Sequence, residues 1–147
     1  MLRKLIATAP TWFNLPVRFT LGLIFFAHGA QKVFGMFGGR GLSAAIAGEA
    51  PFSFMRPSWL WLGAAAFAEL IGGVLVFAGL LTRVGAFLIA ITMLVAMFGV
   101  HWPNFFLQNR GFEYTFALLG MAVALVVAGG GRASVDEMLL ARRVGRR

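Results

Sequence analysis

The 147-residue sequence has no cysteine and few charged residues. Without cysteine, the chain can form no disulfide, no thiol redox relay and no cysteine-ligated metal or iron–sulfur cluster. Charged residues make up 12% of the chain, against about 25% in soluble domains. Hydrophobic residues make up 60%, against roughly 45–50%. Together these values exclude a disordered chain, a collagen-like repeat and an ordinary soluble core.

Acidic residues are scarcer than basic ones. Five Asp and Glu stand against thirteen Lys and Arg, which gives a formal net charge of +8. In a chain this apolar, a basic excess that flanks apolar runs indicates membrane orientation rather than nucleic-acid binding. We therefore expect the lipid bilayer, and no nucleic acid, among the partners of this protein.

Four apolar runs follow one another along the chain. They cover about residues 16–34, 59–81, 84–100 and 113–129. A bilayer core of about 30 Å needs roughly 20 helical residues, so each run is close to the minimum spanning length. The runs lack period-2 alternation and are rich in Ala, Leu and Gly, which favours helices over strands. The sequence predicts an all-α, integral membrane four-helix bundle that forms one domain over residues 1–147.

The connections carry turn and cap signals. The segment between the first two runs could hold a short interfacial helix starting after Ser43. Leu81-Thr82-Arg83 predicts a tight hairpin between the second and third runs. Ser134-Val135-Asp136-Glu137 has a capping-box pattern, which predicts a short basic amphipathic helix in the tail at 134–147.

The distribution of Lys and Arg predicts the orientation. With four spans, both termini share a side with the hairpin at Arg83. That side holds nine basic residues, namely Arg3, Lys4, Arg18, Arg83, Arg132, Arg142, Arg143, Arg146 and Arg147. The other side holds four, namely Lys32, Arg40, Arg56 and Arg110. The positive-inside rule therefore places both termini in the cytoplasm.

Glu69 is the clearest polar residue inside an apolar run. It lies about ten residues, or roughly 15 Å, into the second run and therefore near the bilayer midplane. At helical spacing its face carries mostly small residues, namely Leu62, Ala65, Ala66, Gly72, Gly73 and Val76. Small residues face other helices rather than lipid, so Glu69 is expected to point into the bundle. An ionisable group at this depth costs several kcal/mol and suggests a function.

Further polar residues lie in the half of the bundle that faces away from the cytoplasm. His28, Gln31 and Lys32 share one face of the first helix. Together with Glu69 they suggest a polar, ligand-binding pocket that opens toward the outer face. Its candidate residues are His28, Gln31, Lys32, Glu69, His101, Asn104, Glu113 and Tyr114.

A purely structural interpretation of the same residues also stands. Glu69 could form a buried ion pair with His28 or Lys32 that only fixes the helix register. Lys32 could snorkel to the interface. Glu113 could interact favourably with the dipole of the helix that it begins. Trp102, Phe105 and Phe106 are typical of interfacial anchors.

These residues also carry a family resemblance. The matching segments are Arg18-Phe19-Thr20-Leu21-Gly22, Phe26 to Gly35, Ala68 to Gly73, Gly79 to Arg83, and His101-Trp102-Pro103-Asn104 with Asn109, Gly111, Glu113 and Tyr114. In order and spacing they resemble the DoxX family from about residue 16 to residue 136. Arg110 stands where a second small residue is expected.

The resemblance implies a four-helix, multi-pass protein of the bacterial inner membrane. Members of that family are linked to membrane oxidoreductase systems. These include thiosulfate:quinone oxidoreductase subunits and a mycobacterial complex with a sulfurtransferase and a superoxide dismutase. The resemblance therefore implies partner proteins in a membrane redox complex, while the reaction itself stays open.

Several functions remain open at this point. The pocket could hold a quinone-like or other small ligand in a redox subunit. Alternatively, the chain is a non-catalytic anchor or assembly partner. A haem or metal site at His28 and His101 is disfavoured, because the two lie at different depths and the ligand count is short. A channel would need a homo-oligomer. Close helix packing, within one subunit or between subunits, would be allowed by Gly22, Gly29, Gly72 and Gly73.

Overall fold

The computed structural model describes residues 5–8 and 11–144, with side chains through residue 141, and within those residues it is all-helical without strands. The α-helices are α2 (Asn14–Phe34), α3 (Gly41–Ile46), α4 (Ser58–Ala78), α5 (Thr82–Gly99), α6 (Glu113–Ala128) and α7 (Val135–Val144). A 3-10 turn, η1, covers Leu107–Asn109. The all-α prediction is confirmed. Arg3, Lys4, Arg146 and Arg147, which entered the orientation count, lie outside the described residues.

The helix bounds follow the four apolar runs closely. The largest difference is the end of α4, at Ala78 rather than Leu81. Gly79 and Leu81 both take positive φ angles, 70° and 47°, so the helix cannot continue through them. The prediction for α3 was wrong in its start. The helix begins at Gly41, directly after a glycine-rich turn, and Ser43 lies exposed inside it.

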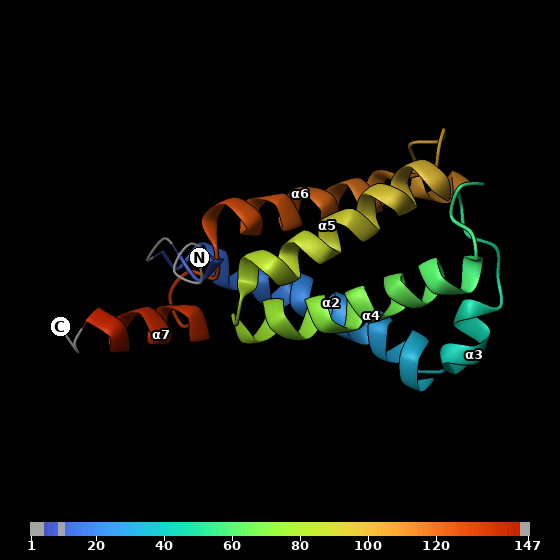
Figure 1. The fold of residues 1–147 in the computed structure, drawn as a ribbon. Coiled ribbons are helices and arrows are strands. Elements are labelled where there is room, and N and C mark those ends of the chain that lie inside the picture. The colour runs from blue at the N-terminus through green and yellow to red at the C-terminus, as the bar shows by residue number, and fades with distance from the viewer. Residues whose placement is uncertain (1–4, 9–10, 145–147) are drawn as a thin grey trace.

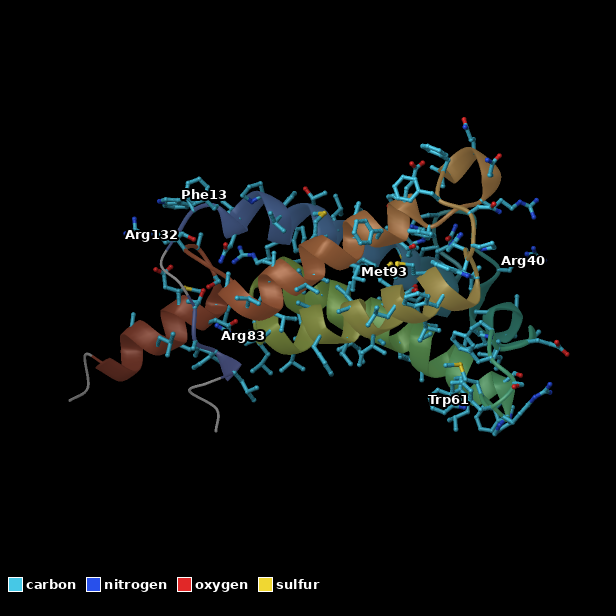
Figure 2. All side chains as sticks on the ribbon, turned by 90° about the horizontal axis from the view of Figure 1, so that it is seen from above. Phe13, Arg40, Trp61, Arg83, Met93 and Arg132 are labelled. Carbon is cyan, nitrogen blue, oxygen red and sulfur yellow. The ribbon has the colours of Figure 1, made fainter. Side chains whose placement is uncertain are left out.

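Four long helices lie alongside one another (Figure 1). The contact between α2 and α4 is the most extensive, followed by that between α5 and α6 and that between α4 and α5, while α3 contacts both α2 and α4. Figure 1 places α3 at one end of the bundle and α7 beyond the other. These are called the α3 end and the α7 end below. Figure 2 shows Arg40 and Trp61 at the α3 end, and Arg83 and Arg132 at the α7 end.

Glycines bring α2 and α4 into close contact. A Cβ atom added at Gly22 or Gly29 of α2 would collide with the α4 backbone. One added at Gly73 of α4 would collide with α2, while Gly72 faces α5 instead. The close packing expected of these glycines is therefore found within one chain. The core beside this contact is apolar and includes Leu21, Phe25, Val76, Ile89, Leu118, Ala122 and Leu125.

The outer surface of the bundle is also apolar. Large exposed side chains occur on all four long helices, for example Phe19, Leu23, Phe67, Ile71, Phe87, Leu94, Phe116 and Val127. Two helices, α4 and α5, are long and apolar enough to cross a membrane. Only 28% of the most apolar stretch of α4 is buried, and 44% of that of α5. Core helices of soluble proteins are mostly buried, so these two differ from them.

The C-terminal helix begins with the predicted cap. The Glu137 amide donates a hydrogen bond to Ser134 Oγ at 3.1 Å. The Glu137 carboxylate accepts a hydrogen bond from the Ala133 amide at 3.0 Å. In a standard capping box the donor would be the amide of the next residue, Ser134. α7 extends beyond the bundle roughly along its long axis (Figure 1).

Candidate functional site

The central feature of the bundle is an ion pair between α2 and α4. Glu69 lies on the buried stripe of α4 with Ala66, Gly72 and Gly73, and its side chain is 8% exposed. Lys32, in the last turn of α2, donates from Nζ to both carboxylate oxygens, at 2.6 and 2.7 Å. Of the two partners that the sequence suggested for Glu69, the structure selects Lys32.

An apolar cavity of about 280 Å³ opens beside this ion pair, mainly between α4 and α5. Its lining consists of Lys32, Pro51, Met55, Trp61, Leu62, Ala64, Ala65, Ala68, Glu69, Leu88, Ile91, Thr92, Val95, Ala96 and Val100. Pro51 and Met55 cover it at the α3 end. The Thr92 hydroxyl donates to the Ile89 carbonyl at 2.8 Å, so its proton is already used within α5. The ion pair is therefore the main polar feature of the cavity.

The cavity is reached from the side of the bundle. Trp61, Ala64 and Ile91 line it and are themselves exposed on the outer surface. In a bilayer, an opening of this kind faces the acyl chains rather than water. It would admit a molecule dissolved in lipid.

A second pocket, of about 350 Å³, opens at the α3 end. It is called the vestibule here and is lined by Gln31, Lys32, Gly38, Gly39, Arg40, Gly41, Ala44 and Ala45. Gly38, Arg40 and Ala44 are exposed, so the vestibule opens to the surface. Lys32 lines both the vestibule and the cavity.

His28 lies apart from the ion pair. It is exposed on α2, whereas the interior of that helix is formed by Leu21, Phe25 and Gly29. His28, Gln31 and Lys32 do share a face, but that face borders the buried stripe rather than coinciding with it. Lys32 reaches Glu69 because its four-carbon side chain is long enough to extend from this face to the buried carboxylate. The shorter imidazole of a histidine is not.

The remaining candidates belong to the connection between α5 and α6. His101 Nδ1 lies 2.9 Å from the Arg110 carbonyl oxygen. Glu113 accepts a hydrogen bond from the Leu107 amide at 2.6 Å. These contacts hold the connection in shape, and neither residue lines the cavity or the vestibule.

Asn104 and Tyr114 are both exposed. The Asn104 side-chain amide donates to the Asn109 carbonyl at 3.3 Å. Of the eight residues that the sequence suggested, the structure brings Gln31, Lys32 and Glu69 to the two pockets and leaves five elsewhere. The described residues hold no group of three or more His, Asp or Glu side chains that could bind a metal ion.

A second buried polar cluster, at the α7 end, was not predicted. Asp136 is 1% exposed and accepts from the Leu81 amide at 2.8 Å, the Thr82 amide at 2.9 Å and the Thr82 hydroxyl at 2.8 Å. Arg18 donates to the carbonyls of Gly130 at 3.0 Å and Ala133 at 2.9 Å. The sequence interpretation, which gathered polar function at the opposite half, was incomplete here. The feature of the sequence that could have indicated this cluster is Arg18, a charged residue inside the first apolar run.

Arg83 joins two more segments at the same end. Its Nε donates to the Ala7 carbonyl at 2.9 Å, and its Nη1 to the Val126 carbonyl at 2.7 Å. The arginines of the α7 end therefore bind carbonyls that helix ends and loops leave without partners. This cluster holds Ala7 and the start of α7 to the bundle, and neither pocket reaches it.

Fold and site together define a helical protein with an apolar surface, a lateral cavity and a partly buried ion pair. The family model described as DoxX matches residues 13–102, and the chain belongs to this family of membrane proteins. A similar protein of Bacillus subtilis (strain 168) is named "Putative oxidoreductase CatD". It is 38% identical over 112 residues, which cover 76% of this chain and 77% of CatD. No solved structure matches.

Proposed function

We propose that α2, α4, α5 and α6 each cross the bacterial inner membrane, with the α7 end in the cytoplasm. The apolar side chains exposed on all four helices support a lipid environment, because soluble proteins rarely expose so continuous an apolar surface. Basic residues support the orientation. Arg83 and Arg132 lie at the α7 end (Figure 2), and Arg18 binds the carbonyls of Gly130 and Ala133 there.

We further propose that the cavity binds a small lipid-soluble ligand of the quinone or hydroquinone type. The observation that carries this proposal is the Lys32–Glu69 ion pair in the wall of an otherwise apolar, laterally open cavity. A quinone needs an apolar slot for its ring and a few polar groups for its oxygens.

The ion pair offers both kinds of hydrogen-bond partner. The Lys32 ammonium can donate to a quinone carbonyl, and the Glu69 carboxylate can accept from a hydroquinone hydroxyl. The cavity volume of about 280 Å³ lies just below the roughly 300–1,000 Å³ typical of ligand sites. It suits one substituted ring, with any tail extending into lipid through the side opening.

The name of CatD supports a redox role for the family branch, and the proposal extends that role to this chain. The chain has no cysteine, so thiol or cysteine-ligated iron–sulfur chemistry would have to come from another protein. We therefore propose that the chain is the ligand-holding subunit of a membrane redox complex, as a monomer or homo-oligomer beside a partner that exchanges electrons with the ligand.

A structural role is the second candidate, and one observation favours it. Lys32 and Glu69 bind each other at 2.6 Å, so each satisfies the other without a ligand. In that case the pair fixes the register of α2 against α4, and the chain serves as an anchor or assembly partner.

Purification in a mild detergent, followed by mass spectrometry of co-purifying small molecules, separates the two candidates. We expect a quinone-type molecule with the wild type, and its loss in Ala65→Phe, which fills the cavity next to Glu69. Ala124→Phe is the matched control, because Ala124 is exposed on α6 away from the cavity. Equal ligand content in both variants, or none in the wild type, would favour the structural role.

A further inference from the structure

Lys32 is the one residue shared by the linings of the cavity and the vestibule. We propose that the Lys32–Glu69 pair passes protons between the cavity and the water at the α3 end, so that the site exchanges protons with that side of the membrane only. This rests on the proposed function for the role of the cavity and for the membrane position of the α3 end.

The exposures of the two side chains define the route. The Glu69 side chain is 8% exposed, whereas that of Lys32 is 40% exposed. The carboxylate therefore meets the aqueous vestibule through the ammonium group that it binds at 2.6 Å. Gln31 and Arg40 line the vestibule beyond Lys32 and keep it polar.

The opposite direction offers no comparable route. The interior between Glu69 and the α7 end consists of apolar residues and glycine, among them Leu21, Phe25, Gly73 and Val76. Within the described part of the chain, the next buried titratable groups are Arg18 and Asp136, in the cluster at the far end. Of the residues that line either pocket, only Lys32, Glu69 and Arg40 are charged.

The proton transfer balances without any electron step. A hydroxyl bound in the cavity gives its proton to the Glu69 carboxylate. Lys32 then releases a proton from its ammonium group to vestibule water and becomes neutral. Glu69 passes its proton to the neutral Lys32, which restores the ion pair. The sum is one proton moved from the bound hydroxyl to water at the α3 end, with the hydroxyl oxygen left as an oxyanion in the cavity that Lys32 lines. The reverse sequence takes one proton up and restores the hydroxyl.

Labelling with dicyclohexylcarbodiimide tests this directly. The reagent is lipid-soluble and reacts with protonated carboxyl groups, so the labelling rate of Glu69 reports its protonation. The full chain is studied in sealed right-side-out and inverted membrane vesicles, with the pH changed on one side only. The modified peptide is quantified by mass spectrometry, with Glu69→Gln identifying the label.

We expect the labelling rate to follow the pH of the compartment at the α3 end and to rise when that compartment is acidified. A rate that follows the pH at the α7 end, or both sides equally, would overturn the proposal. Lys32→Met should abolish the response, whereas Arg56→Met, at an exposed residue that lines neither pocket, should keep it. An unchanged response in Lys32→Met would also contradict it.

No ligand is added in these measurements, so they separate the two proposals. Sided labelling without quinone binding would leave the proton route standing and remove the proposed ligand. Quinone binding with labelling that does not depend on the side would keep the proposed ligand and remove the proton route.

Discussion

At the scale of single residues, the ion pair is asymmetric. Lys32 is partly exposed to the vestibule, while Glu69 is buried against α2. A lysine that loses its partner can turn its ammonium group to water. A buried carboxyl group that loses its partner keeps an unsatisfied polar group in an apolar surrounding, which costs about 1–3 kcal/mol.

This asymmetry predicts different stabilities for two single variants. Lys32→Met should lower the free energy of unfolding by about 1–3 kcal/mol, whereas Glu69→Gln should lower it by less, since Gln can still accept from Lys32. Thermal unfolding in detergent measures both. The double variant should be more stable than the sum of the single effects predicts, because the two residues contact each other. A larger loss in Glu69→Gln than in Lys32→Met would contradict the geometry described.

At the scale of elements, the contact between α2 and α4 depends on glycine. The backbone of α2 at Phe25 and Phe26 occupies the space that a side chain at Gly73 would need. We expect Gly73→Ala to separate the two helices and to destabilise the protein by about 1–3 kcal/mol, a typical cost of overpacking.

Gly120 on α6 provides the matched control, because an added Cβ would meet nothing within 4 Å there. Gly120→Ala should leave the melting temperature unchanged or slightly raised, since Ala favours helices. An equal change in melting temperature for both substitutions would contradict this prediction, because the close contact with α2 exists at Gly73 and not at Gly120.

The attachment of α7 gives a second prediction at this scale. Asp136 accepts three hydrogen bonds from Leu81 and Thr82, two of them from backbone amides at the start of α5. Asp136→Ala should cost about 3 kcal/mol, as expected when charge-assisted bonds to buried donors are lost. It should also release α7 from the bundle. Limited trypsin digestion would then cut faster after the exposed Arg132, while Met138→Ala, at an exposed residue of α7, should change the rate little.

The elements were largely predictable and their contacts were not. Apolar runs and turn residues located α2, α4, α5 and α6, because helix formation depends on local sequence. The pairing of Lys32 with Glu69 was one of two stated alternatives, and the sequence could not choose between them. The Arg18 and Asp136 cluster was missed, since the two residues lie far apart in the chain and only the fold brings them to one end. The lateral cavity depends on how α4 and α5 diverge, which no sequence pattern reports.

At the scale of the whole molecule, the proposed topology places the α3 end outside the inner membrane and the α7 end in the cytoplasm. The wild-type chain has no cysteine, so each introduced cysteine is a unique label. Arg40→Cys at the α3 end should react with a membrane-impermeant maleimide added outside intact cells. Arg132→Cys at the α7 end should react only in inverted vesicles. The reverse pattern, or reaction of both from one side, would show that the proposed topology is wrong.

Binding of a quinone to the cavity is the central claim, and a titration tests it most directly. Wild-type protein in lipid nanodiscs is titrated with a short-chain benzoquinone, and bound ligand is measured by quenching of tryptophan fluorescence, since Trp61 lines the cavity. We expect saturable binding that Ala65→Phe abolishes, that Glu69→Gln weakens by about tenfold, or 1.4 kcal/mol, and that Ala124→Phe leaves intact. Absence of saturable binding in the wild type, or equal affinity in all four proteins, would contradict the account.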